Sequence, residues 1–373
     1  MQISPFEMER WQSVWENKVE LNIAESGVLP LSVGELVDDP DTLARVLATP
    51  LGYPQTNGSE ELRSRIASLY PGAKAENVLV TCGCAEANFL VAWWRLDPGD
   101  EVVLMLPNYM QLGGLARAFG GVVIPLWLRE ELGWAPDLDE LLRLVSDKTR
   151  LVAVCNPNNP TGASLSEEAI ERICAAAAKS GAYLLADEVY RGAEFDGVLS
   201  PTFWGRYERV ICTGGLSKAY ALPGLRIGWI VGPAKLVDEL WAYHDYTSIS
   251  ATMLGDRLAS LALEPMRRQW ILERTRGILH QNYPVVAEWV KRHGEIFRHV
   301  PPRAGAIAWV GCPKNWNTAQ LTEDARVHKG VLIVPGEQLG KASHLRIGFG
   351  YTASKLEQAL ERMEEVLMKV TRG

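Results

Sequence analysis

The amino-acid sequence predicts an α/β protein whose larger part is built on a mainly parallel seven-stranded sheet and whose smaller part is α+β. Short runs of near-continuous apolar residues, typical of strands buried on both faces, occupy residues 78–81, 101–106, 122–128, 151–155, 183–186, 210–213 and 227–231. Helical patterns lie between most of these runs, at residues 85–94, 111–119, 138–145 and 167–179. Buried strands that alternate with helices indicate a parallel sheet covered on both sides.

The chain before this region begins with a predicted helix and continues as an irregular segment. Ser4, Pro5 and Glu7 supply an N-cap, a proline at the first helical position and a glutamate three residues after the cap. The helix then places three apolar side chains on one face, which we interpret as a docking stripe: Met8, Trp11 and Trp15. Residues 21–36 lack a helical period and are expected to form an ordered loop over the larger body, and a second helix is expected at residues 59–70.

The pattern changes after Gly232. Long helical stretches occupy residues 234–243, 255–263 and 265–292, short strands follow at residues 306–310, 331–334 and 345–349, and a charged helix covers residues 354–370. We therefore expect a large domain at residues 40–255. A small domain is expected to combine residues 1–39 with residues 256–373.

Composition excludes several classes of function. The 373 residues carry a net charge of -7, which argues against a nucleic-acid or anionic-membrane partner. No apolar run approaches the roughly 18 residues that a membrane helix needs, and no signal peptide is apparent at the N-terminus. The six cysteines contain no C-x-x-C pair, so neither zinc nor a disulfide framework is expected. These features predict a cytoplasmic enzyme without a metal.

A single lysine, Lys218, lies between the last two predicted strands of the sheet, in the stretch Thr213-Gly-Gly-Leu-Ser-Lys-Ala-Tyr-Ala-Leu-Pro-Gly-Leu-Arg-Ile-Gly-Trp229. A lysine is almost never fully buried without a partner. One chemical explanation is an imine, because a desolvated amine loses its proton and attacks an aldehyde. The alternative is a lysine in a surface loop, and this stretch alone does not decide between them.

Polar and aromatic residues follow the other predicted strands, at the sheet edge where ligands collect. Cys82-Gly-Cys-Ala-Glu86 opens a helix, where backbone N–H groups can hold a phosphate. Later strands are followed by Tyr109, Asn159, Asp187 and Tyr190. Each has a purely structural interpretation as well, since Tyr109 can pack, Asn159 can brace its turn, and Asp187 can cap a helix or pair with an arginine. Together with Lys218 and Arg226 they match what pyridoxal 5'-phosphate (PLP) requires.

In these motifs the sequence resembles a class I/II aminotransferase of the fold-type I PLP superfamily, the aspartate aminotransferase-like group. The motifs are Asn159-Pro-Thr-Gly162, Asp187-Glu-Val-Tyr190, Ser217-Lys218 and Gly224-x-Arg226-x-Gly228, in this order. The resemblance implies that Lys218 is the Schiff-base lysine and that Asp187 pairs with the ring nitrogen. It also implies that Asn159 and Tyr190 contact the ring oxygen and that Tyr109 stacks on the ring.

Further roles follow from the same resemblance. The phosphate is expected to be held by Gly83, Cys84, Ala85, Ser217 and Arg226. Tyr53 is expected to reach the phosphate in a neighbouring subunit, which implies a homodimer with shared active sites. Arg346, in His344-Leu-Arg-Ile-Gly348, is expected to bind the substrate α-carboxylate, with Asn159 also contacting the substrate. In one departure, Gly215 stands where many relatives carry a hydroxyl residue, and Ser217 or Thr213 can substitute for it.

The resemblance implies transfer of an amino group from an L-amino acid to a 2-keto acid by a ping-pong aldimine/ketimine mechanism. The nearest alternative is PLP-dependent elimination, replacement or cyclisation, because the Glu25–Glu35 loop resembles a branch of the family that includes capreomycidine synthase. A non-catalytic PLP-binding regulator would need a DNA-binding domain for which the chain has no spare length. A nucleotide-binding dehydrogenase would need a G-x-G-x-x-G after a strand, and none is present.

The irregular loop also suggests a substrate preference. It offers Glu25 and Glu35 and contains no lysine or arginine. If these carboxylates face the pocket, they favour a cationic or strongly hydrogen-bonding side chain and repel aspartate or glutamate. Two solvated loop glutamates are the alternative.

Overall fold

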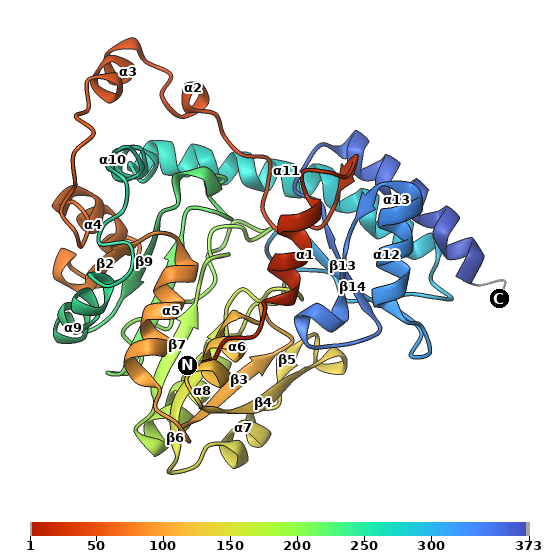
Figure 1. Ribbon diagram of the computed structural model, residues 1–373, viewed down its shortest axis with the longest axis horizontal. Helices are drawn as coiled ribbons and strands as arrows, with labels where there is room; N and C mark the ends of the chain where they lie inside the picture. The colour runs from red at the N-terminus through yellow and green to blue at the C-terminus, as the bar shows by residue number, and fades with distance from the viewer. Residues whose placement is uncertain (1, 371–373) are drawn as a thin grey trace.

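The computed structural model describes residues 2–370 and shows a large sheet covered by helices, with a second α+β unit beside it (Figure 1). Eight strands form the large sheet in the order β2-β9-β8-β7-β6-β3-β4-β5. Their bounds are β2 Val78–Thr81, β3 Glu101–Leu106, β4 Val122–Arg129, β5 Ala135–Pro136, β6 Thr149–Cys155, β7 Tyr183–Asp187, β8 Val210–Gly215 and β9 Gly228–Val231.

Strand direction in this sheet confirms the predicted fold class. The neighbours from β8 through β7, β6 and β3 to β4 are parallel, and only β9 and β5 run antiparallel to their partners. The seven predicted strands are all present, and β5 is an eighth. β5 has only two residues, which is too short for an apolar run to be recognised in the sequence.

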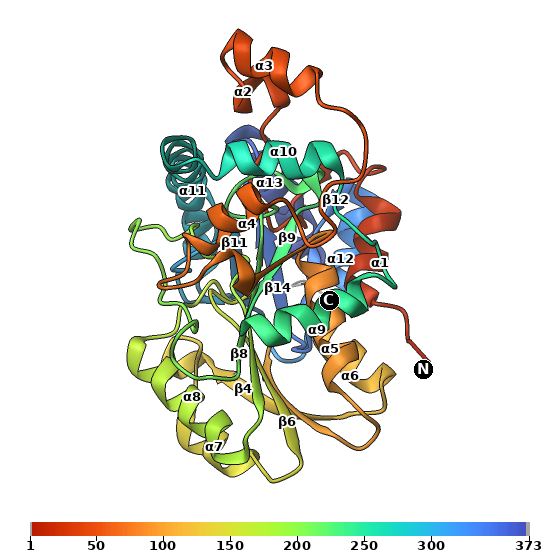
Figure 2. The same ribbon diagram turned by 90° about the vertical axis from the view of Figure 1, so that its left-hand side faces the viewer.

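Helices cover both faces of the sheet, as Figure 2 shows. One face packs on α5 (Cys84–Arg95), α6 (Gln111–Ala118) and α9 (Ala234–His244), and the other on α7 (Leu138–Leu144), α8 (Glu167–Ser180) and α4 (Glu60–Ala67). A hydrophobic core lies on each side of the sheet, and alternate residues of a strand point into one or the other. In β6, Leu151 and Ala153 belong to one core, and Val152 and Val154 belong to the other. Burial on both faces explains the continuous apolar runs.

The α+β unit contains an antiparallel sheet in the order β10-β11-β14-β13. These strands are β10 Arg298–His299, β11 Ile307–Gly311, β13 Val334–Pro335 and β14 His344–Gly348, and the helices around them are α10 Met253–Ala262, α11 Pro265–Arg292, α12 Thr318–Lys329 and α13 Ala353–Val370. A short parallel pair, β1 (Leu21–Asn22) with β12 (Val331–Leu332), joins an early segment to this unit. The domain boundaries at residues 39/40 and 255/256 stay a prediction.

The first helix, α1 (Glu7–Trp15), begins later than predicted. Its N-cap is Phe6, which makes no side-chain cap hydrogen bond, so the Ser4 cap was wrong. The predicted docking face is used: Met8 is buried, Trp11 Nε1 donates to the Ile333 carbonyl at 3.4 Å, and Trp15 lies under the Arg326 guanidinium at 3.6 Å. These contacts fix which side of α1 faces away from the α+β unit.

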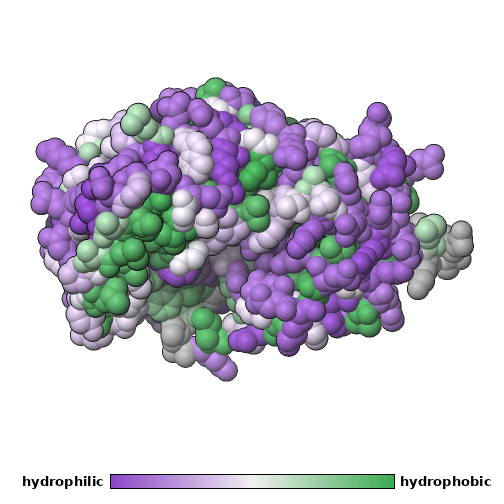
Figure 3. Space-filling view, turned by 90° about the horizontal axis from the view of Figure 1, so that it is seen from above, coloured by the Kyte–Doolittle hydropathy of each residue, from purple (hydrophilic) through white to green (hydrophobic). Residues whose placement is uncertain are grey.

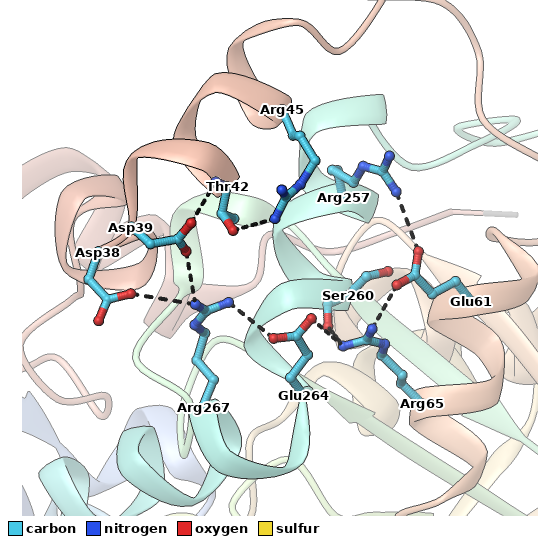
Figure 4. Close-up of polar contacts among 10 residues, drawn as sticks. All are labelled: Asp38, Asp39, Thr42, Arg45, Glu61, Arg65, Arg257, Ser260, Glu264 and Arg267. Atoms are coloured by element: carbon cyan, nitrogen blue, oxygen red, sulfur yellow. Dashed lines mark hydrogen bonds and ion pairs between the residues drawn. The ribbon is translucent and has the colours of Figure 1, made fainter.

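The segment with α2 (Val33–Leu36) and α3 (Pro40–Leu47) extends away from the rest of the chain (Figures 1 and 2). An ion-pair network holds its base (Figure 4). Arg267 lies 3.6 Å from Asp38 and 3.2 Å from Glu264, and Glu264 also pairs with Arg65 at 3.2 Å. We call residues 33–53 the arm.

The molecular surface seen from above is largely hydrophilic, with hydrophobic residues gathered in separate patches (Figure 3). Across the described residues, 2–370, none of the helices has both the length and the apolar character needed to cross a membrane.

Candidate active site

The strand ends of the large sheet, the start of α5, the helix α1 and the loop at residues 25–30 surround a cavity of about 570 Å³. It brings together most of the residues singled out in the sequence: Cys84, Ala85, Tyr109, Asn159, Asp187, Tyr190, Ser217, Lys218 and Arg226. The residues come from segments far apart in the chain because parallel strands end at one edge.

Lys218 follows β8 and faces Glu25 across the cavity. Its Nζ donates to Glu25 Oε1 at 2.8 Å, and the same oxygen accepts the Ser26 and Gly27 backbone N–H groups at 2.9 and 2.8 Å. Burial opposes the charge on Lys218, but the Glu25 carboxylate outweighs it, so the pKa of Lys218 is raised. The Lys218 charge in turn lowers the pKa of Glu25 to about 2. The surface-loop alternative for Lys218 is therefore wrong.

The loop that carries Glu25 is fixed to the end of β14. The Gly348 N–H donates to the Ile23 carbonyl at 2.7 Å, and the Leu29 N–H donates to the Gly350 carbonyl at 2.8 Å. A side chain at Gly348 would overlap the Glu25 carbonyl, so this close approach needs glycine. The backbone thus holds the Glu25 carboxylate at Lys218.

Asp187 ends β7 and is buried, with 8% of its surface exposed. Its Oδ2 accepts from Asn88 Nδ2 at 3.0 Å, its Oδ1 accepts from the Val189 N–H at 3.1 Å, and Thr213 Oγ1 donates to Asn88 Oδ1 at 2.9 Å. Burial raises the pKa of Asp187, and these hydrogen bonds only partly offset it. Within residues 2–370 no arginine pairs with Asp187 and no helix begins there, so the structural alternatives for it were wrong.

The predicted phosphate cup lies at the N-terminus of α5. Gly83 is the N-cap with φ 85°, and any side chain on it would collide with the Arg226 guanidinium. Arg226 therefore lies directly over the glycine at a helix terminus whose dipole favours anions. A Cβ at Gly215 would approach the Ile227 carbonyl oxygen to 3.1 Å, so a hydroxyl residue there would need a small shift of that backbone. Thr213 is engaged by Asn88, whereas Ser217 lines the cavity.

Aromatic and amide groups form the remaining walls. Tyr109 Oη donates to Glu9 Oε1 at 2.7 Å, and burial followed by the Glu9 charge raises the pKa of Tyr109. Tyr190 Oη donates to Ser26 Oγ at 2.9 Å. Asn159 Oδ1 accepts from Arg346 Nη1 at 3.0 Å, and among residues 2–370 nothing accepts from the Asn159 side-chain NH₂.

Three predicted residues do not line the cavity: Gly83, which lies under the Arg226 guanidinium, Arg346 and Tyr53. Arg346 is only 1% exposed and lies behind Asn159, where its Nη2 also donates to the Ala24 carbonyl at 2.7 Å. Its Nε has no partner within the described part of the chain. Tyr53, on the arm, is 84% exposed and away from the cavity of its own chain.

The substrate prediction for the loop carboxylates needs a correction. Glu35 is exposed and closes a capping box with Ser32 at the start of α2, so it does not face the pocket. Glu25 does face it.

Further residues of the site were not predicted from the sequence. Glu9 and Gln12 of α1 and Glu16 at its C-cap line the cavity, as does Asn88, which also donates to Asp187. The spacing of residues 9, 12 and 16 on one helical face was the available signal for the first three.

The residues present fit PLP. The cavity contains an amine at Lys218, a buried carboxylate at Asp187, an arginine at a helix N-terminus, a tyrosine ring and an Asn159 amide with unpaired N–H groups. These are the groups that a phosphorylated, aromatic, aldehyde-bearing ring needs. No cluster of three or more His, Cys, Asp or Glu side chains suited to a metal ion occurs within residues 2–370.

Comparisons with known proteins agree with this fit. The profile of the aminotransferase class I and II family matches residues 28–363. The chain is 35% identical to capreomycidine synthase of Streptomyces vinaceus (98% of this chain, 94% of that protein) and 30% identical to an arginine–pyruvate transaminase of Pseudomonas aeruginosa (90% and 89%). The crystal structure of a PLP-dependent aminotransferase from Streptococcus suis superposes with a TM-score of 0.92 at 33% identity, covering 99% of both chains.

Proposed function

The chain belongs to the class I and II aminotransferase family, whose cofactor is PLP, and from that premise we propose that it transfers an amino group from an L-amino acid to a 2-keto acid. The observation that carries the proposal is the convergence of Lys218, Asp187 and Arg226 on one cavity. In the overall exchange the donor carbon becomes a ketone and the acceptor carbon gains the amine, so no external oxidant is needed.

The cofactor, when bound, supplies an aldehyde that condenses with amines and a ring that stabilises negative charge at the substrate Cα. Arg226 and the start of α5 would hold the phosphate, and Tyr109 would lie against the ring. Asp187 would keep the ring nitrogen protonated. The Asn159 NH₂ and Tyr190 would contact the ring oxygen.

Lys218 moves the proton from the substrate Cα. Its Nζ must be neutral to accept that proton, whereas Glu25 stabilises the charged form. We therefore expect the Lys218–Glu25 contact to loosen during turnover. Arg346 binds the substrate α-carboxylate once Asn159 or the Ala24 carbonyl yields one of its N–H groups.

A single-turnover experiment tests the reaction type. Holoenzyme mixed with one equivalent of a reactive amino acid, and no keto acid, should release one equivalent of 2-keto acid while the nitrogen stays on the cofactor. Adding a 2-keto acid should then return the nitrogen as a new amino acid. Products are measured by mass spectrometry. Release of ammonia would contradict amino transfer.

The second candidate is PLP-dependent elimination, replacement or cyclisation. It is favoured by the 35% identity to capreomycidine synthase over 98% of the chain. The single-turnover experiment separates the two candidates, because this one predicts ammonia or a cyclic product and an unchanged nitrogen count on the cofactor.

We also propose a homodimer with shared active sites. Large apolar side chains are exposed on the arm, just after α9 and at the start of α11: Leu47, Leu51, Tyr53, Tyr246 and Met266. An extended arm with an exposed apolar side is suited to pack on a second copy. Tyr53 then serves the phosphate of the neighbouring site. A cytoplasmic location is proposed from the six free cysteines.

Mixing two defective chains tests the shared site. Lys218→Ala and Tyr53→Phe chains, each impaired alone, are unfolded together and refolded so that hybrids form. One site of each hybrid then has both residues, so activity should rise above that of either parent. The same chains refolded separately and mixed afterwards are the control. A monomeric active species in sedimentation would contradict the proposal.

A further inference from the structure

One face of α1 presents three polar side chains to the cavity. Glu9, Gln12 and Glu16 are spaced by three and four residues, so they share a face of the helix, and all three line the cavity. The contacts of Trp11 and Trp15, on the neighbouring face, with the α+β unit fix this orientation. None of these three residues is among those expected to bind the cofactor.

The side-chain amide of Gln12 indicates that this face of the helix binds a ligand. The whole residue is only 6% exposed, and its side-chain amide makes no hydrogen bond among residues 2–370. The amide is not one of the fully buried unpaired groups in this part of the chain, so its donors and acceptor stay accessible from the cavity. A ligand in the cavity can supply the partner, since the Gln12 side chain lines that cavity.

The charges beside Gln12 are negative. Within the described residues Glu16 has neither a hydrogen bond to its side chain nor an ion pair. Burial raises the pKa of Glu16, and the charges of Glu25 and Glu9 raise it further. Glu9 uses one oxygen for Tyr109, and Glu25 uses one for Lys218 and its own loop. Among the described residues nothing bonds to the other oxygen of either carboxylate, so that oxygen can face a cation.

We propose that α1 selects an amino-acid substrate whose side chain ends in a cation, bound by Glu16 with the help of Gln12 and Glu9. This inference rests on the proposed function, because it concerns the substrate of that reaction. A guanidinium suits the set best, since its planar N–H groups can reach two carboxylates and an amide oxygen together. Lys218 and Arg226 also line the cavity, but Glu25 neutralises the first and the second belongs to the phosphate cup.

Binding of unreactive probes to the holoenzyme tests the proposal without turnover. The probes are 5-guanidinopentanoate, 6-aminohexanoate, hexanoate and hexanedioate, none of which has an α-amino group; an unchanged cofactor absorbance checks that the terminal amine of 6-aminohexanoate does not condense with the aldehyde. Calorimetry should show 5-guanidinopentanoate binding at least about tenfold more tightly than hexanoate, with hexanedioate weakest, since one charge-assisted contact is worth about this factor. The aminohexanoate measurement separates a guanidinium preference from a general cation preference.

Substitutions in the α1 segment test whether its side chains cause the preference for a cationic probe. Glu16→Gln should weaken binding of 5-guanidinopentanoate about tenfold and leave hexanoate unchanged, and Gln12→Leu should act in the same direction. Glu7→Gln is the matched control, because Glu7 lies on the same helix, is exposed and does not line the cavity. A variant that merely disturbs the fold would weaken all four probes and lower the melting temperature.

The outcomes separate this inference from the proposed function. Equal or tighter binding of hexanedioate, or cation binding that Glu16→Gln leaves unchanged, overturns the inference. Faster keto-acid formation from aspartate, glutamate or leucine than from arginine or ornithine also overturns it, while amino transfer stands. If the holoenzyme binds the cationic probes selectively but forms no keto acid from arginine or ornithine, amino transfer is contradicted. The selection of a cationic side chain by α1 then still stands.

Discussion

Replacing Lys218 with alanine is expected to lower turnover by roughly 10³-fold or more, since proton transfer by a positioned side chain alone contributes roughly 10²–10⁴-fold. The variant should remain folded, because within residues 2–370 the Lys218 amine donates only to Glu25. It should also lose covalent attachment of the cofactor. Borohydride treatment followed by mass spectrometry is expected to add the cofactor mass to the wild-type chain and not to the variant.

A matched control for this experiment is Lys235→Ala, since Lys235 is an exposed lysine of α9 outside the cavity. It should keep both activity and the covalent label. Near-normal turnover of Lys218→Ala would remove Lys218 from the mechanism. An unchanged borohydride label would show that another amine holds the cofactor.

The strands of the large sheet were predictable because they are buried on both faces. Residues 78–81 and 101–106 form continuous apolar runs, and β2 and β3 have those bounds. The two-residue strands β5 and β10 give no such run. The helix α12 was missed because its buried face consists of Thr318, Leu321, Thr322 and Ala325, so half of it is polar in the sequence.

The candidate site was predictable where it lies at strand ends. Asp187 and Lys218 immediately follow apolar runs, so topology alone brings them to one edge. Glu9, Gln12 and Glu16 lie at no strand end, and their spacing on one helical face was their only signal. The apolar stripe of α1 predicted a docking face and did not show what the next face meets, and packing against the α+β unit turns that face toward the cavity. Only the tertiary structure determines this.

The same limit explains the error at Glu35. An acidic residue three positions after a serine is typical of a capping box, and Ser32 and Glu35 form one. Glu25 in the same loop reaches Lys218 because glycines at residues 348 and 350 let the backbone approach β14 closely. The two glutamates look alike in the sequence. Only the local backbone geometry shows that Glu25 faces the cavity and that Glu35 does not.

Changing Asp187 to asparagine is expected to leave the apo-protein almost as stable as the wild type. Burial raises the folded-state pKa of Asp187 above its unfolded value, so its stabilising contribution is present at low pH and is lost as pH rises through the folded pKa. At pH 7 its charge therefore costs stability, and asparagine removes that cost. The loss of one acceptor for Asn88 or Val189 opposes this gain. We expect the apo melting temperature to change by only about 3 °C.

Turnover of Asp187→Asn should nevertheless fall by roughly 10²-fold or more, because a neutral amide no longer favours the protonated ring nitrogen and the substrate Cα–H bond is less acidified. The expected signature is slow proton loss with intact binding, measured as reduced exchange of the substrate Cα hydrogen with deuterated water. Asp196→Asn, at an exposed aspartate, should change neither quantity. Wild-type exchange rates in Asp187→Asn would show that Asp187 does not act on the ring, whereas a large loss of apo stability at pH 7 would show that its buried carboxylate is there to hold the fold.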